Sequence, residues 1–430
     1  MEPFKVEQWE IWYTFSTYIE AHISNLEKVA KALVDLELSE CCMLSNGLTF
    51  CKTEEGVASG ETSLKLSADL KQTSAEFVTY PNVEMSPFAK ETWLVGVQFI
   101  YGEARQISRG RELPSLHLRA FLNPIALFKR EERISYLYPM IVLYETGILL
   151  VEFRIISPEN SVSLNEFIEN YVNIQQHEYD YAFVSSMISA LAPEVYQYYS
   201  KPRANIFDRI QVLRKRRKQK ILLDKVTKEI DIGDFTFELT PLPRTDDTET
   251  ITSVALTLFT IIGYLSKQPD TSYNFLFKGF PDLPDVANFW SGRPHVHMFK
   301  HSNQASTSSK NEEVNKSIFG QILARIPTIQ GDCSVYVPAD ARPFEDYSAY
   351  IISAGSLWVW SADGMKHQQQ WMDVNRGNLV YEHQVQVELL EYGYMLHKAL
   401  IEKSMKVKNY PELLSTRKDL VELKSRMLES

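Results

Sequence analysis

The sequence predicts an α+β protein with two β-hairpin-containing sheet domains, packed amphipathic helices, a basic helical connector and a C-terminal helical hairpin. Three stretches, at 41–52, 138–156 and 347–361, have the apolar strands and turn residues of β-hairpins. Two capping boxes are each followed by apolar residues at helical spacing, which predicts packed helices. The expected boundaries are 1–205 for the N-terminal α+β domain, 206–230 for the connector, 231–380 for the second α+β domain and 381–430 for the helical hairpin.

The N-terminal region is predicted to begin with a strand and a helix. Residues 6–18 are rich in aromatic and β-branched side chains, which are typical of strands. Residues 24–27, Ser-Asn-Leu-Glu, fit a capping box with Ser24 as the N-cap. The helix that follows is indicated by apolar residues at helical spacing, namely Leu26, Val29, Ala30, Leu33 and Val34.

The first hairpin turns at Asn46 and Gly47, a pair that suits the positive φ angles of a type I′ turn. Counting outward from a two-residue turn places Cys42 opposite Cys51. Opposite Cβ atoms lie about 4.5–5.5 Å apart, close to the separation that a disulfide needs. Cys42 and Cys51 are therefore a candidate redox pair, and the alternative is that both are small buried core thiols.

The remainder of the first domain is predicted to be mainly β. Residues 53–63 are rich in Gly, Ser, Thr and Glu and predict a loop. Strands are predicted at 64–80, 93–101 and 116–128, and the second hairpin is predicted to turn near Gly147. The second capping box, at 163–166, precedes an apolar stripe that predicts a helix and consists of Leu164, Phe167, Ile168, Tyr171 and Val172.

The second half of the chain contains an uncharged run at 250–266. Its length is at the lower limit for crossing a bilayer and several Thr and Ser residues interrupt it, so a buried core helix or strand is expected. The other expected elements are a helix at 205–229, a strand at 231–240, a loop at 241–249 and a polar loop at 301–317.

Composition and motifs restrict the class of protein. The formal net charge of −10 argues against a chain that coats nucleic acid along its whole length. The start of the sequence lacks the basic and apolar regions of a secretory signal, which favours a cytoplasmic protein. Four cysteines without a CxxC pair indicate neither a disulfide framework nor a zinc knuckle. The GxSxG, GxGxxG and HExxH motifs of common hydrolases and nucleotide-binding proteins are absent.

A histidine-rich stretch at 293–301 is a candidate metal site. On a strand, alternation places His295, His297 and His301 on one face, and Asp282 or Asp285 could add a carboxylate ligand. Zinc or manganese held there could lower the pKa of a bound water and support hydrolysis. The alternative is a strand whose histidines bond to the backbone or to water.

A basic stretch at 209–220 is a candidate for binding phosphates. Nucleic acid or anionic lipid would be attracted to such a segment, with an affinity that falls steeply as salt rises. On a helix, however, consecutive basic residues point all round, so a solvated connector is the alternative reading. The basic residues are Arg209, Arg214, Lys215, Arg216, Arg217, Lys218 and Lys220.

The C-terminal region carries an apolar seam at alternating spacings of four and three residues: Val385, Leu389, Tyr392 and Leu396. This spacing is typical of a helix that packs on another helix, so a protein partner or a homo-oligomer is expected to bind through 381–430. The sequence therefore favours a non-enzymatic regulatory or scaffold subunit without a cofactor. The alternatives are a metal-dependent hydrolase that could act on nucleic acid, and a cytosolic domain of a longer membrane-associated protein.

Overall fold

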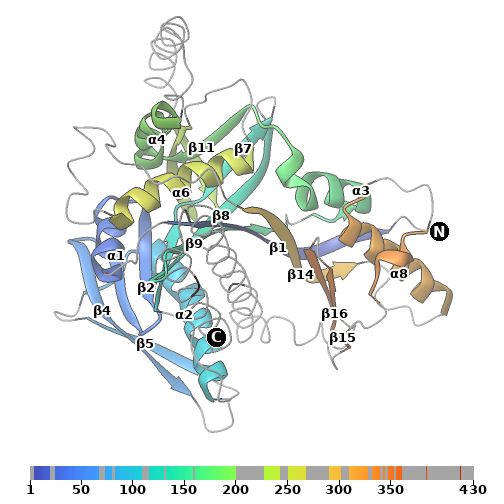
Figure 1. The fold of residues 1–430 in the computed structure, drawn as a ribbon, viewed down its shortest axis with the longest axis horizontal. Helices are drawn as coiled ribbons and strands as arrows, with labels where there is room; N and C mark the ends of the chain where they lie inside the picture. Colours follow the sequence, from blue (N-terminus) through green and yellow to red (C-terminus); the bar gives the residue numbers. More distant parts are fainter. Residues whose placement is uncertain are drawn as a thin grey trace, which may run out of the picture.

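In the computed structural model of the protein, helices cover both faces of a long mixed β-sheet (Figure 1), so the class is α+β as predicted. The structure describes residues 4–19, 25–66, 73–79, 83–108, 116–129, 132–157, 160–199, 227–242, 250–267, 290–301, 309–327, 332–338, 342–343, 347–352 and 355–360, together with Gln384 and Arg417.

The main sheet runs across the molecule through neighbouring strands that are mostly antiparallel. In spatial order these are β5 (Thr73–Thr79), β4 (Gly56–Leu66), β3 (Leu48–Thr53), β2 (Ser39–Leu44), β6 (His117–Leu122), β8 (Glu132–Tyr144), β9 (Ile148–Ile156), β1 (Lys5–Tyr18), β14 (Trp290–His301), β17 (Gly355–Trp360), β16 (Tyr347–Ile352) and β15 (Arg342–Pro343). The pairing of β14 with β17 is parallel, which makes the sheet mixed. A short strand, β10 (Val162–Ser163), pairs with the start of β1.

A second sheet branches from the first at β8. The first half of β8 pairs with β7 (Ile125–Lys129), whereas its second half pairs with β6 in the main sheet. The second sheet continues through β11 (Tyr181–Ser185), β13 (Phe235–Pro241) and β12 (Lys228–Ile232). Since β11 and β13 come from either side of the predicted connector, the second sheet ties those two parts of the chain together.

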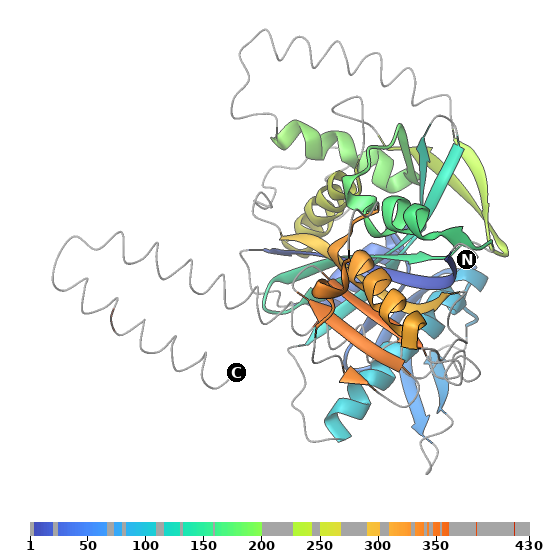
Figure 2. The ribbon, with the colours of Figure 1, turned by 90° about the vertical axis from the view of Figure 1, so that its right-hand side faces the viewer.

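The helices divide between the two faces of the main sheet. One face packs against α1 (Leu26–Asp35), α4 (Ser186–Tyr199), α6 (Ile251–Lys267) and α8 (Ser309–Ala324), and also against three short consecutive helices, α3 (Leu164–Glu166), η1 (Phe167–Val172) and η2 (Ile174–Gln176). The other face packs against α2 (Pro87–Ser108). In Figure 2 the green and olive helices α4 and α6 lie on one side of the blue strand β1, and the light-blue helix α2 lies on the other.

Strand β1 shows how alternation separates the two faces. Trp9, Ile11, Tyr13 and Phe15 belong to the large core under α1, α4 and α6. Trp12 belongs to the smaller core under α2. Successive side chains of a strand point to opposite faces, so a strand buried on both sides reads as a nearly continuous apolar run.

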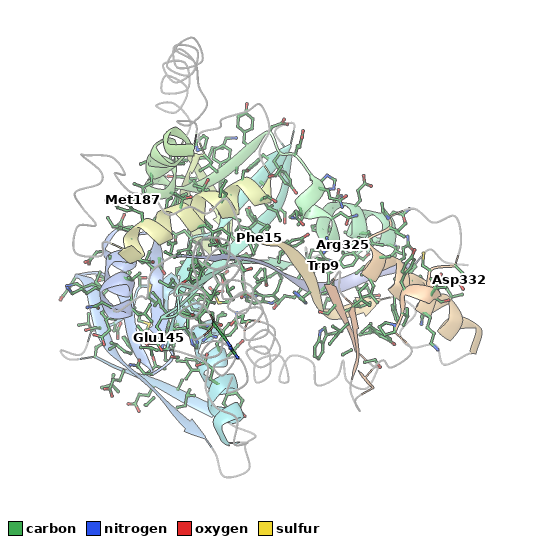
Figure 3. All side chains as sticks on the ribbon, viewed as in Figure 1. Trp9, Phe15, Glu145, Met187, Arg325 and Asp332 are labelled. Carbon is green, nitrogen blue, oxygen red and sulfur yellow. The ribbon has the colours of Figure 1, made fainter. Side chains whose placement is uncertain are left out.

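Arg325, which is labelled in Figure 3, directly follows α8 and joins that helix to β1. It has a positive φ of 60°, and the amides of Arg325 and Ile326 donate to the carbonyls of Ile322 and Gln321, the hydrogen bonds of a Schellman motif. Glycine usually occupies this position. Here the arginine donates to the Tyr13 hydroxyl at 3.3 Å, so its side chain joins the helix to the central strand.

Several predicted elements are confirmed. The strand at 6–18 is β1, the hairpins at 138–156 and 347–361 are β8–β9 and β16–β17, and the uncharged run at 250–266 is the buried helix α6. The second capping box is also confirmed, because the Ser163 side chain accepts a hydrogen bond from the Glu166 amide at 3.2 Å.

Three predicted loops or strands are wrong. Residues 53–63 were expected to form a loop, but most of them lie in β4, which gains pairing from both β3 and β5. Residues 93–101 were expected to form a strand, but they lie in α2, whose buried positions recur at helical spacing at Ala89, Thr92, Trp93, Gly96 and Phe99. The expected loop at 301–317 is helical from Ser309 onward.

Two local geometries also differ from prediction by one residue. The first helix is capped by Asn25 rather than Ser24, since the Asn25 side chain accepts from the Lys28 amide at 3.0 Å. The first hairpin has a three-residue loop, in which the Gly47 amide donates to the Leu44 carbonyl and Gly47 has a φ of 91°. A type I turn followed by a left-handed glycine replaces the expected type I′ turn.

The predicted domain boundaries at 205 and 231 stay a prediction. Strand β1 comes before them and pairs with β14, which comes after them, so separate domains would share neighbouring strands of one sheet. The predicted connector at 206–230 lies outside the described residues up to position 226, and its end belongs to β12, where Lys228 and Glu229 pair with β13. The predicted loop at 241–249 and the helical hairpin at 381–430 lie mostly outside the described residues.

Candidate functional site

A buried network of ionisable and amide side chains lies on the face of the main sheet that α2 covers. Thr14 of β1, Arg119 of β6 and Glu152 of β9 point to this face, and Glu103 approaches from α2. Each is at most 5% exposed. Their surroundings are apolar and aromatic, so the network needs internal partners to replace lost hydration.

One end of the network is a cluster of Glu103, His117 and Arg119. The Arg119 guanidinium donates to Glu103 Oε1, and His117 Nε2 lies 3.0 Å from the same oxygen. The guanidinium also lies over the Phe99 ring at 4.8 Å. Burial alone would raise the pKa of Glu103, but the neighbouring charges and hydrogen bonds of Arg119 and His117 outweigh it and lower that pKa. Glu103 is therefore a carboxylate that neutralises Arg119.

Gln384 connects this cluster to Glu152. An Arg119 nitrogen donates to Gln384 Oε1 at 2.9 Å, and Gln384 Nε2 donates to Glu152 Oε2. The Thr14 hydroxyl donates to the other oxygen of Glu152 at 2.9 Å. Gln384 is 0% exposed, so its carboxamide is part of the interior although it comes from a distant part of the chain.

Glu152 has an unusual acidity. Burial raises the pKa of Glu152 from 4.5 to about 7, although hydrogen bonds from Thr14 and Gln384 and the charge of Arg119 act in the opposite direction. A carboxyl group with this pKa can exchange a proton near neutral pH. Glu152 is 0% exposed, however, so in this conformation no bulk substrate reaches it.

An ion pair extends the polar stripe along β1 and β9. Arg154 donates to Glu10 Oε2 at 2.9 Å, and the Trp12 indole donates to Glu10 Oε1 at 2.7 Å. Trp12 lies opposite Arg154 in the sheet, two residue pairs along from Thr14 and Glu152 and therefore on the same face. The stripe therefore follows the β1–β9 pairing on a single face.

The predicted metal-site residues are only partly described. His295 lies in β14 and is 8% exposed, and its Nδ1 lies 2.8 Å from the Ser356 hydroxyl of β17. The pairing of β14 with β1 is irregular between His297 and His301, which interrupts the strict alternation behind the single-face prediction. Asp282 and Asp285 lie outside the described residues. Within the described ranges, His, Cys, Asp and Glu form no group of three or more suited to a metal ion. The zinc or manganese site stays a prediction.

The predicted cysteine register is wrong by one residue. Cys51 lies opposite Cys41, and Cys42 lies opposite Phe50, because the three-residue turn shifts the pairing. All three thiols are free and buried. Burial raises the pKa of Cys42 and of Cys51 to about 12, and it raises the pKa of Cys41 well above its usual value. Thiols with such pKa values form little thiolate, which favours the alternative reading of core thiols over a redox pair.

The predicted phosphate-binding stretch and the predicted association seam stay predictions. The basic residues Arg209, Arg214, Lys215, Arg216, Arg217, Lys218 and Lys220 lie outside the described residues, as do the seam residues Val385, Leu389, Tyr392 and Leu396. Gln384, directly before the seam, is described.

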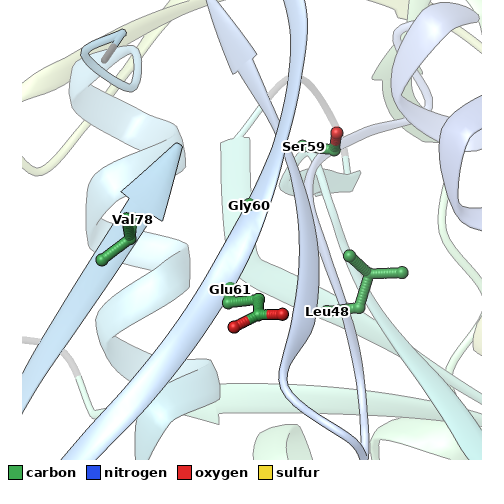
Figure 4. A pocket seen from close by; sticks show the side chains of 5 residues that line it. All are labelled: Leu48, Ser59, Gly60, Glu61 and Val78. Carbon is green, nitrogen blue, oxygen red and sulfur yellow. The ribbon is translucent and has the colours of Figure 1, made fainter. Parts of the chain in front are cut away.

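A hollow of about 340 Å³ lies on the strands β3, β4 and β5 (Figure 4). Its lining is formed by Leu48, Ser59, Gly60, Glu61 and Val78. Among the described residues of this lining, Glu61 is the single ionisable group, so they bring together no acid–base pair or set of ligands.

No protein-family model, curated protein or solved structure matches the chain. In the described part of the chain, the helices are too short or too polar to span a bilayer. Any proposal about function therefore rests on the sequence and on the geometry of the described residues.

The sequence reasoning missed the whole buried network. One signal was present, because Arg119 is the one formally charged residue of β6, and Glu152 and Arg154 are the two charged residues of the otherwise apolar β9, a pattern that indicates buried pairing. Their link through Gln384 had no local signal, since Gln384 lies 232 positions from Glu152 and 265 from Arg119.

Proposed function

We propose that the protein is a non-enzymatic regulatory or scaffold subunit of the cytoplasm that binds a protein partner or a second copy of itself through 381–430. The burial of Gln384 between Arg119 and Glu152 supports this proposal. Gln384 directly precedes Val385, the first residue of the seam. A segment fixed to the core at its start can transmit the binding of a partner to the rest of the molecule.

The apolar seam supplies enough surface for association. Burying one large aliphatic or aromatic side chain contributes about 1.5–3 kcal/mol. Four such positions, Val385, Leu389, Tyr392 and Leu396, exceed the lower estimates of the cost of bringing two chains together, which begin at about 4 kcal/mol. The burial of the ionisable network favours a structural over a catalytic use of Glu152.

The test compares the mass of the wild type with that of the double variant Leu389→Asp/Leu396→Asp by light scattering. For a homo-oligomer, the variant is expected to fall to the single-chain mass of 49.6 kDa. Val335→Asp, at a position that is 78% exposed, is the matched control and should keep the wild-type mass. An unchanged mass in the double variant contradicts self-association through the seam.

If the wild type already has the mass of a single chain, the proposed partner is a different protein, and a second experiment tests that case. Affinity capture from the source cells should then recover a protein that binds the wild type and Val335→Asp and is lost from Leu389→Asp/Leu396→Asp. Identical captured proteins for all three baits would contradict association through 381–430.

A further inference from the structure

The two groups of the network that contact Gln384 are also held by other side chains. Glu103 and His117 lie beside the Arg119 guanidinium, and Thr14 donates to one oxygen of Glu152. These side chains come from α2, β6, β1 and β9, all within residues 5–156. A guanidinium nitrogen and a carboxylate oxygen are thus fixed on the same face of the sheet, each with a bond that Gln384 completes.

The geometry between these two groups matches a primary carboxamide. Gln384 Oε1 accepts from Arg119 at 2.9 Å, and Gln384 Nε2 donates to Glu152. A carboxylate in this place would turn an acceptor toward Glu152, and an ammonium group would turn a donor toward Arg119. An aliphatic side chain would leave a buried donor and a buried acceptor without their bonds, which costs about 1–3 kcal/mol for each group.

We propose that Arg119 and Glu152 form a carboxamide-binding site on the α2-facing side of the sheet, and that its ligand is Gln384 of the same chain. Through this contact Gln384 docks on the central sheet. Thr14, Glu103 and His117 are positioning residues, because they orient the two groups that touch the carboxamide. The docking concerns the same segment as the proposed function but does not require association.

The structure offers a swap that tests direct recognition in the full-length chain. At about pH 9, where Glu152 is ionised, Gln384→Glu replaces the amide donor by an acceptor, so it repels Glu152 while it keeps its bond to Arg119. Adding Glu152→Gln restores the match, because a glutamine at 152 can donate to a glutamate at 384 and still accept from Thr14. Gln176→Glu makes the same chemical change at an exposed position and is the control.

Hydrogen–deuterium exchange gives the readout, for peptides that contain position 384 and for peptides from β9. Gln384→Glu is expected to accelerate exchange in both by about tenfold or more, since the lost bond to Glu152 and the repulsion that replaces it together correspond to at least that factor. The double variant should return both peptides to within about threefold of the wild type. Gln176→Glu should leave both unchanged.

Two results would overturn the inference. An exchange rate in Gln384→Glu equal to that of the wild type would show that the site does not recognise the carboxamide. An exchange rate in the double variant as high as in Gln384→Glu would show that positions 152 and 384 do not contact each other. The proposed association is judged separately by the mass and capture measurements on the seam variants, so either proposal can fail while the other stands.

Discussion

The side chains of β9 that point toward α6 are Leu149, Val151, Phe153 and Ile155, whereas Glu152 and Arg154 of the same strand point toward the α2 side. The four side chains on the first face are held by packing alone, whereas Glu152 and Arg154 on the second face combine packing with charge. On the apolar face, any shape that fills the space suffices. On the polar face each group depends on a particular partner, so a small chemical change there has a large effect.

The largest expected effect is on the polar face, where Glu103→Gln keeps the shape and removes one charge. Arg119 then stays buried without its carboxylate, and we expect a loss of about 3–5 kcal/mol in the free energy of unfolding. Denaturant titration measures it. Replacing both partners, as in Glu103→Leu/Arg119→Met, should recover much of the loss, because apolar groups of similar size need no counter-charge. A loss below about 1 kcal/mol for Glu103→Gln would remove the contrast between the two faces.

The second prediction concerns pH. Because the folded state raises the pKa of Glu152 from 4.5 to about 7, it holds a proton that the unfolded chain releases. Its contribution is full below about pH 4.5 and is lost as the pH rises through about 7, with an amplitude of order 3 kcal/mol. Glu103, whose pKa is lowered, acts oppositely, and its contribution is lost as the pH falls. Denaturant titration gives the free energy of unfolding at about pH 5 and about pH 8. The change in this free energy between the two pH values should be smaller for Glu152→Gln than for the wild type. An equal change in both proteins would contradict the raised pKa of Glu152.

A third, smaller effect is expected where α2 packs against Met43 of β2 and Phe121 of β6. A Cβ atom on Gly96 would lie 2.1 Å from the Met43 sulfur and 3.1 Å from the Phe121 ring. Gly96→Ala should therefore push α2 outward and cost about 1–3 kcal/mol, despite the higher helix propensity of alanine. Thermal unfolding measures the loss. Leu94→Ala, at a position on the same helix that is 49% exposed, should change stability by less than about 0.5 kcal/mol. A stabilised Gly96→Ala would mean that α2 has room to move.

The smallest effect is expected on the apolar face. Ile141→Val removes one methyl group from β8 at a fully buried position, and it should cost about 0.5–1.5 kcal/mol by denaturant titration. Ile141→Val removes a carbon atom whereas Glu103→Gln removes none, so a larger loss for Glu103→Gln measures how much the polar face depends on charge rather than on shape. A loss for Ile141→Val equal to that of Glu103→Gln would mean that both faces depend on close packing to the same degree.

The sequence predicted the apolar skeleton better than the polar network, for physical reasons. Strands such as β9 and helices such as α6 bury continuous or periodic apolar residues, and that pattern is local. Helix α2 was mistaken for a strand because Val95 and Val97 favour extended chains, although Ser86 and Pro87 mark a helix start and the Ala89 amide donates to the Ser86 hydroxyl at 3.3 Å. The contact of Gln384 with Glu152 depends on folding across 232 positions, which no local pattern encodes.

The central place of β1 has a consequence for synthesis on the ribosome. One edge of β1 pairs with β9, which ends at Ile156, but the other edge pairs with β14, which begins at Trp290. At ordinary translation rates, on the order of 10 to 30 s separate the emergence of these two partners. Throughout that interval the nascent chain carries a long unpaired edge that can recruit strands from other chains. The yield of correctly folded protein therefore depends on how well that edge is shielded until the second half of the sheet emerges.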